Sequence, residues 1–145
     1  MSSLTWSTKS IREKDIKRDW HLIDVSGKIL GRIAPEITKF LIGKHKTNYV
    51  SYLDMGDYVV VVNATKVKVT GRKDKQKVYT RYSGYPGGLR KVKYEDMMKK
   101  NPQEIIKKAV AGMLPKNKLR DRRIARLFIF AKETHSYQDK FELKK

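Results

Sequence analysis

The feature that most constrains the fold of this chain is an unbroken apolar run at residues 58–62, Tyr-Val-Val-Val-Val. A strand with one solvated face alternates apolar and polar side chains, whereas a continuous β-branched run is typical of a strand that is buried on both faces. Such strands occur mainly in parallel sheets that other layers cover. The run therefore predicts a buried strand within a parallel sheet.

A helix is predicted before this strand. Apolar side chains recur at helical spacing from Ile29 to Leu41 and form one stripe, and Gly43 is a suitable C-cap. Pro35 interrupts the pattern, because a proline in a helix interior removes a hydrogen bond and costs roughly 3 kcal/mol. Burial of several large apolar side chains, at roughly 1.5–3 kcal/mol each, outweighs that cost. We therefore expect a helix that is kinked at Pro35 or starts near it, and that still packs on the sheet.

The rest of the chain alternates between predicted helices and strands. A second helix starts at residues 101–104, Asn-Pro-Gln-Glu, which provide a cap, a proline at the first position and an acid three residues after the cap. A third helix covers about 119–126, and further strands are expected at 22–25, 67–70, 78–82 and 127–131. This alternation predicts an α/β layered domain over residues 20–131, an extended N-terminal arm (1–19) and a C-terminal tail (132–145).

Positive charge is strongly in excess. The 145 residues include 34 Lys and Arg against 15 Asp and Glu, a net charge of +19. Residues 64–131 carry 20 basic and 5 acidic side chains, whereas residues 1–63 have a net charge of only +3. Self-repulsion of this size opposes a compact state, so we expect an anionic partner: nucleic acid, an acidic membrane surface or an acidic protein.

The densest basic block covers residues 116–126, with six basic side chains and one acid. Solvated helix faces usually interleave acids with bases, so this composition favours phosphate binding over a plain solvated surface. On a helix, Arg122 and Arg126 share a face and Arg123 lies beside them. We therefore expect these three arginines to form one exposed, phosphate-binding face that contributes little to folding.

Two other segments are weaker candidates. Residues 43–47, Gly-Lys-His-Lys-Thr, follow the first helix, where lysines also suit the helix dipole, so a structural role stays open. Residues 82–90, Tyr-Ser-Gly-Tyr-Pro-Gly-Gly-Leu-Arg, combine glycines that let the backbone approach a phosphate with tyrosines that can stack on bases. A simple turn explains the second segment equally well.

The usual signatures of catalysis are missing from the sequence. There is no cysteine, which excludes disulfides, cysteine zinc sites and cysteine nucleophiles. Neither the phosphate-loop and dinucleotide glycine patterns nor the zinc-protease and serine-hydrolase motifs occur. His21, His45 and His135 are too scattered along the chain to indicate a metal site. We therefore predict no catalytic residue, metal, cofactor or small-molecule substrate. We also predict no membrane span, because no apolar run approaches 18 residues.

Several motifs, in a fixed order, resemble the large-subunit ribosomal protein thirteen family in its bacterial or organellar form. They cover roughly residues 17–135 and include Gly-Lys-Ile-Leu-Gly-Arg-Ile-Ala at 27–34, Leu-Ile-Gly-Lys-His-Lys at 41–46, Gly-Asp-Tyr-Val-Val-Val-Val-Asn-Ala at 56–64, Ser-Gly-Tyr-Pro-Gly-Gly-Leu at 83–89 and, most specifically, Ala-Val-Ala-Gly-Met-Leu-Pro-Lys-Asn-Lys-Leu at 109–119. The chain departs from the family pattern at Pro35, at Arg120-Asp121 and at residues 135–137.

The resemblance implies a three-layer α/β/α single domain around a mainly parallel four-stranded sheet. It implies a structural constituent of the large ribosomal subunit that binds ribosomal RNA, contacts neighbouring ribosomal proteins and supports early assembly and translation. A cytoplasmic ribosome is expected, with an organellar one left open. A nucleotide-using α/β enzyme and a DNA-compacting protein are the alternatives. The expected RNA-binding residues are Lys44, His45, Lys46, Lys68, Arg72, Lys73, Arg81, Tyr85, Arg90, Lys116, Asn117, Lys118, Arg120, Arg122, Arg123 and Arg126.

Overall fold

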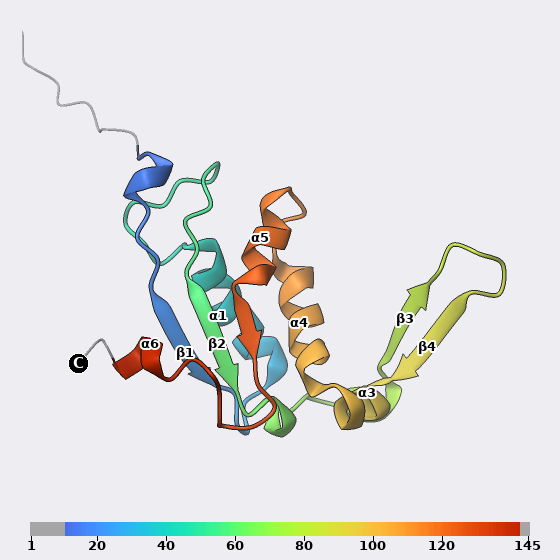
Figure 1. The fold of residues 1–145 in the computed structure, drawn as a ribbon. Helices are drawn as coiled ribbons and strands as arrows, with labels where there is room; N and C mark the ends of the chain where they lie inside the picture. The colour runs from blue at the N-terminus through green and yellow to red at the C-terminus, as the bar shows by residue number, and fades with distance from the viewer. Residues whose placement is uncertain (1–10, 143–145) are drawn as a thin grey trace, which may run out of the picture.

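The body of the protein is built on a parallel sheet. The structure, a computed structural model, describes residues 11–142, and its central sheet contains β1 (Trp20–Asp24), β2 (Tyr58–Val62) and β5 (Leu127–Ile129). The strand order is β1-β2-β5, and both pairs are parallel (Figure 1). The apolar run at 58–62 is thus the central strand, as its sequence predicts.

The described sheet has three strands, not the four that the resemblance implies. Around the expected strand at 67–70 the chain forms a 3-10 turn, η2 (Ala64–Lys66), and then a single parallel bridge between Ile29 and Lys68. The strand predicted at 78–82 exists as β3 (Val78–Tyr82), but it pairs with β4 (Leu89–Lys93) in a separate antiparallel hairpin. These strands are exposed almost throughout, and their apolar side chains Val78, Tyr82, Leu89 and Val92 are exposed with the basic ones.

Helix α1 (Leu30–Ile42) forms in spite of its internal proline. It begins at Leu30, so the expectation of a start near Pro35 is wrong, and Pro35 lies on the exposed side of the helix. The predicted stripe is buried, and Gly43 ends the helix in the left-handed conformation at φ 87°. Burial of Ile33, Ile37 and Leu41 outweighs the lost hydrogen bond.

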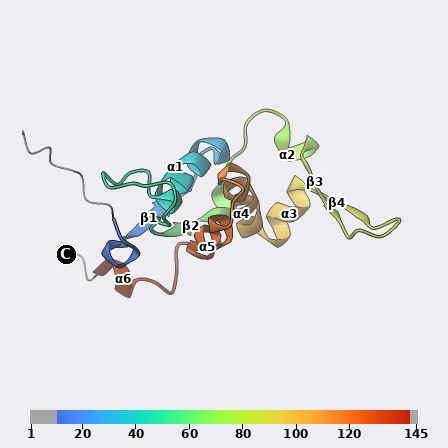
Figure 2. The same ribbon diagram turned by 90° about the horizontal axis from the view of Figure 1, so that it is seen from above.

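One face of the sheet is covered by α1 and α4 (Pro102–Met113) (Figure 2). Helices α3 (Tyr94–Lys100) and α5 (Leu119–Ala125) lie at opposite ends of α4 (Figure 1). Ile23, Val59 and Val61 of the strands meet Ile37, Ile105 and Val110 of the helices in this core.

The remaining short helices are η1 (Glu13–Asp15), α2 (Lys73–Gln76) and α6 (Asp139–Glu142). None of the described helices is long and apolar enough to cross a membrane.

The opposite face of the sheet is covered by aromatic side chains. Trp20 of β1 stacks on Tyr58 of β2, with ring centroids 4.5 Å apart, and lies 5.8 Å from Phe128 of β5. The C-terminal tail crosses this face, since Tyr137 lies 5.2 Å from the Trp20 ring and Phe141 meets its edge at 6.4 Å. Two covered faces explain why the run at 58–62 has no polar position.

Two glycines bring the end of α1 against the start of β2. A Cβ atom on Gly56 would lie 1.8 Å from the Leu41 carbonyl oxygen, and one on Gly43 would lie 2.6 Å from the Met55 carbonyl oxygen. Both contacts are too close for any side chain, so only glycine fits at either position. The close approach holds the loop of residues 43–57 at the amino end of the sheet, where it carries Asp54 and Asp57.

Candidate nucleic-acid interface

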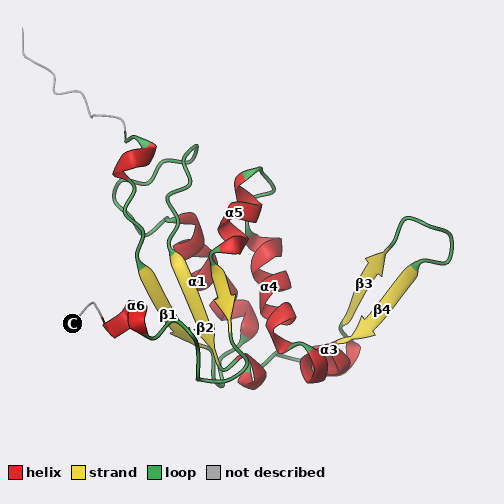
Figure 3. Ribbon diagram, viewed as in Figure 1, coloured by secondary structure: helices red, strands yellow, loops and turns green. Residues whose placement is uncertain are grey.

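The β3–β4 hairpin projects away from the body of the protein (Figure 3). Residues 77–93 contain five basic side chains and no acid. Tyr82 and Tyr85 are 63% and 76% exposed near the tip of the hairpin. A basic, two-stranded projection with accessible aromatic rings can reach into a folded RNA and contact both its phosphates and its unpaired bases.

The base of this hairpin is fixed to the helices. The Tyr79 ring has the Nζ atoms of Lys77 and Lys108 over it, at 5.2 and 5.1 Å from its centroid. The Tyr94 N–H at the start of α3 donates to the Lys77 carbonyl oxygen at 2.9 Å. Burial raises the pKa of both Tyr79 and Tyr94. The projection is therefore anchored at one end and free at the other.

A second basic surface lies at the amino end of the sheet, on α5 and the turn before it. Lys116, Asn117, Lys118 and Arg122 are exposed there, and Arg120 is half-buried. The Leu119 N–H donates to Asn117 Oδ1 at 3.2 Å, which fixes the turn into the helix. The three exposed cations, Lys116, Lys118 and Arg122, are accessible to a phosphate backbone.

The expectation of one exposed arginine face on α5 is wrong for two of its three residues. Arg123 is 1% exposed and Arg126 is 8% exposed, and both point towards Asp54. Arg126 donates two hydrogen bonds of 2.6 Å, from Nη1 to Oδ2 and from Nη2 to Oδ1 of this carboxylate. Arg123 Nε lies 3.5 Å from Oδ1, and Arg18 Nη2 donates to the Asp54 carbonyl oxygen at 3.1 Å.

These contacts decide the charge state of Asp54. Burial raises the pKa of its carboxyl group, but the hydrogen bonds and charges of Arg126, followed by the charges of Arg123 and Arg18, lower it below its ordinary value. The carboxylate therefore stays ionised and neutralises part of the cluster. Arg123 and Arg126 hold α5 to the loop before β2, and only Arg122 of the three faces solvent.

A second carboxylate, the fully buried Asp57, is contacted by donors from two segments of the chain, residues 19–21 and 45–46. His21 Nε2 and His45 Nε2 each lie 2.9 Å from its Oδ2 atom. Its Oδ1 atom accepts from Lys46 Nζ and, at 3.1 Å, from the Asp19 N–H. Lys46 Nζ also donates to the carbonyl oxygens of Lys17 at 2.6 Å and Met55 at 3.0 Å. The Lys46 ammonium is thus directed inwards, into backbone and carboxylate oxygens.

His21 and His45 lie close together although they are 24 positions apart, so the argument from their scatter along the chain is wrong for this pair. With Asp57 they form a group whose possible metal-ligating atoms lie within 4.8 Å of one another. The 2.9 Å contacts are hydrogen-bond distances, however, and the Lys46 ammonium already neutralises the carboxylate. A dication at this position would meet that ammonium directly, so we interpret the group as a structural hydrogen-bond cluster.

The predicted RNA-binding residues thus divide by accessibility. Eleven of them are exposed: Lys44, Lys68, Arg72, Lys73, Arg81, Tyr85, Arg90, Lys116, Asn117, Lys118 and Arg122. His45, Lys46 and Arg120 are partly buried, and Arg123 and Arg126 are buried. Sequence reasoning missed Asp54 and Asp57, although the rarity of acids in this chain was a signal that each acid could have a structural partner.

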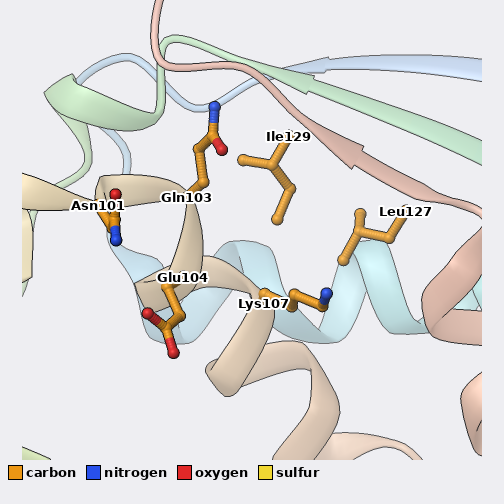
Figure 4. Close-up of a pocket in the computed structure, with 6 residues that line it drawn as sticks. All are labelled: Asn101, Gln103, Glu104, Lys107, Leu127 and Ile129. Atoms are coloured by element: carbon orange, nitrogen blue, oxygen red, sulfur yellow. The ribbon is translucent and has the colours of Figure 1, made fainter.

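A further surface pocket lies between the start of α4 and the β5 strand (Figure 4). Asn101, Gln103, Glu104 and Lys107 line it from the helix side, and Leu127 and Ile129 from the strand. Figure 4 shows none of the converging acid, base or nucleophile arrangements that catalysis needs in this pocket. The pocket therefore adds no support for the enzyme alternative.

Comparison with known proteins gives a consistent result. Residues 18–136 match the family described as ribosomal protein L13. Proteins named large ribosomal subunit protein uL13 from Dehalococcoides mccartyi and Clostridioides difficile are 48% and 51% identical over 131 and 123 residues. These alignments cover 90% and 85% of this chain, and 92% and 86% of the relatives. A relative of the same name from Thermotoga petrophila is 47% identical over 131 residues, which are 90% of this chain and 88% of that protein.

Substitution of Arg126, which binds Asp54, should affect stability more than substitution of the exposed Arg122. Arg126→Ala removes both short hydrogen bonds to Asp54 and should lower the free energy of unfolding by roughly 3 kcal/mol. Arg122→Ala is the matched control and should change it by less than about 0.5 kcal/mol, because the side chain is exposed. Urea unfolding of both variants tests this. Equal midpoints for the two would contradict the structural role of Arg126.

Asp57 should make the free energy of unfolding depend on pH in the acid range. Burial raises the pKa of this carboxyl group, but hydrogen bonds from His21, Lys46 and the Asp19 N–H lower it from 3.8 to about 2. Because the folded-state pKa is depressed, the contribution of about 2 kcal/mol is complete above pH 4 and is lost as the pH falls towards 2. The stability difference between wild type and Asp57→Asn should therefore narrow over this range. A difference that stays constant from pH 5 to pH 2 would refute the assignment.

Proposed function

The chain belongs to the ribosomal protein L13 family, and from this premise we propose that it is a structural component of the large ribosomal subunit that binds ribosomal RNA. The family is a ribosomal one without enzymatic activity. The observation that carries the RNA-binding proposal is the β3–β4 hairpin, a projection with five basic side chains and no carboxylate over residues 77–93. Phosphate groups are the anions that such a projection would meet within a ribonucleoprotein.

The direct RNA contacts are assigned to the exposed members of the predicted set. Most of them lie in two regions: the hairpin, with Arg81, Tyr85 and Arg90, and the amino end of the sheet, with Lys44, the turn at 116–118 and Arg122. Lys68, Arg72 and Lys73 lie on the connection that leads into the hairpin. Lys46, Arg123 and Arg126 act indirectly, because their charged groups are held by Asp57 and Asp54.

A role in subunit assembly follows from the balance of charge. A net charge of +19 on 145 residues repels itself, and binding of RNA phosphates relieves that repulsion while it orders the RNA around the bound protein. Neighbouring large-subunit proteins are the other partners that we propose, as the resemblance to the family implies. With this function, the protein would be located on the ribosome.

The salt dependence of binding tests this function. If six to ten phosphates are neutralised, the affinity for a large-subunit ribosomal RNA transcript should fall on the order of a thousandfold or more between 50 and 200 mM salt. Filter binding over a salt series measures the slope, and a DNA duplex of equal length is the control for a DNA-compacting role. Weak binding with a flat salt response, or tighter binding to the duplex, would contradict the proposal.

A further inference from the structure

The register of the hairpin sets two arginines directly opposite each other. Arg81 of β3 is the cross-strand partner of Arg90 of β4. Directly opposed residues in an antiparallel pair point to the same face, with Cβ atoms roughly 4.5–5.5 Å apart. Like charges in this position destabilise the pair of strands. The register therefore places an unfavourable pair of like charges next to the last pair before the turn.

The hairpin itself contains nothing that neutralises this pair. No aspartate or glutamate occurs in residues 77–93, and the nearest acids along the chain are Asp74 in α2 and Glu95 in α3, beyond the base of the hairpin. On the same face, the next cross-strand pair towards the base is Tyr79 with Val92. Lys77 and Lys108, which lie over the Tyr79 ring, add positive charge rather than compensate it.

The space beside the two arginines is a surface pocket. Its lining consists of Arg81, Tyr82, Ser83, Gly87, Gly88 and Arg90. A Cβ atom on Gly88 would lie 2.0 Å from Ser83 Oγ, so the absence of a side chain at Gly88 lets the Ser83 hydroxyl group lie against the turn. Gly87 has a φ of 75°, which favours glycine there as well. The pocket thus combines two guanidinium groups with a hydroxyl group and glycine backbone.

We propose that Arg81 and Arg90 together clamp one phosphate group of the RNA backbone, with the Ser83 hydroxyl group as a further donor. The inference rests on the proposed function and deepens it, because it names one site and one ligand group. Guanidinium groups match phosphate oxygens through paired hydrogen bonds. A phosphate between them replaces the repulsion with two attractions. The exposed rings of Tyr82 and Tyr85 favour a nucleic acid over an acidic peptide, since they offer stacking surfaces to adjacent bases.

A double-mutant cycle distinguishes one shared phosphate from two separate ones. The full-length chain and its Arg81→Gln, Arg90→Gln and doubly substituted variants would be titrated with a large-subunit ribosomal RNA transcript over a salt series. Each single substitution should weaken binding on the order of tenfold and reduce the salt slope by about 0.7–0.9, the value for one phosphate. The affinity of the double variant should also be about tenfold below that of the wild type, because either single substitution already disables the shared site.

Lys91 provides the matched control. It adjoins Arg90 in sequence, carries the same charge and points to the opposite face of the hairpin, opposite Thr80. Lys91→Gln should show no coupling with Arg90→Gln. The affinity loss of the Lys91/Arg90 double variant should therefore equal the product of the two single-variant losses. Circular dichroism of each variant checks that the fold is kept, which is expected because Arg81, Arg90 and Lys91 are all exposed.

The outcomes separate this site from the function as a whole. A loss of about a hundredfold in the Arg81/Arg90 double variant would mean that each arginine binds its own phosphate, and would overturn the shared site. Wild-type affinity in all three variants would also overturn it, while leaving RNA binding by the other surface intact. If the wild-type chain itself fails to bind the transcript, the proposed function and this site both fall.

A second readout uses the free protein. Arg81→Glu sets a carboxylate opposite Arg90, so the hairpin amides should exchange hydrogen more slowly than in the wild type, while RNA binding weakens by tenfold or more. Unchanged or faster exchange would show that the arginine pair stores no repulsion and would contradict the physical basis of the proposal.

Discussion

Two carboxylates, the partly buried Asp54 and the fully buried Asp57, hold the elements at the amino end of the sheet together. Asp54 joins α5 to the loop before β2 through Arg126 and Arg123. Asp57 joins the end of that loop to β1 through His21, and to the start of the loop through His45 and Lys46. Removal of the Asp54 carboxylate would leave the buried Arg123 and Arg126 without an acidic partner, and removal of the Asp57 carboxylate would leave Lys46 with only two backbone carbonyl acceptors. Loss of its partner by a buried charge is far more costly than loss of a surface ion pair. The loop, the first strand and the fifth helix therefore depend on these two side chains.

This arrangement divides the positive charge into two functions. The cations that face Asp54 and Asp57 stabilise the fold. Those on the hairpin and on the turn at 116–118 have no acid beside them in the sequence and are mostly exposed, as the proposed RNA contacts require. Residues only two positions apart take different roles, since Lys44 faces solvent and Lys46 faces Asp57. A basic protein can in this way fold before its partner arrives and still present an unneutralised surface to it.

The sequence predicted those parts of the structure that depend on local pattern. The apolar run at 58–62, the stripe of α1 and the C-cap at Gly43 all form, because periodicity and burial decide them. The role of Arg123 and Arg126 could not be read from helix spacing, because it depends on Asp54, some 70 residues earlier. The same holds for His21 and His45, which only the fold brings together on Asp57. Strand β4 was not predicted, because three of its five residues are basic and the segment resembles a solvated loop.

The central claim is that exposed and carboxylate-bound cations have separate functions, and lysine acylation followed by mass spectrometry tests it most directly. The free chain and the assembled large subunit would be labelled under the same conditions, and the rates at Lys44 and Lys46 compared. We predict that Lys44 reacts rapidly in the free chain and is protected in the subunit, whereas Lys46 reacts slowly in both. Equal rates for the two lysines in the free chain, or full reactivity of Lys44 in the subunit, would contradict the account.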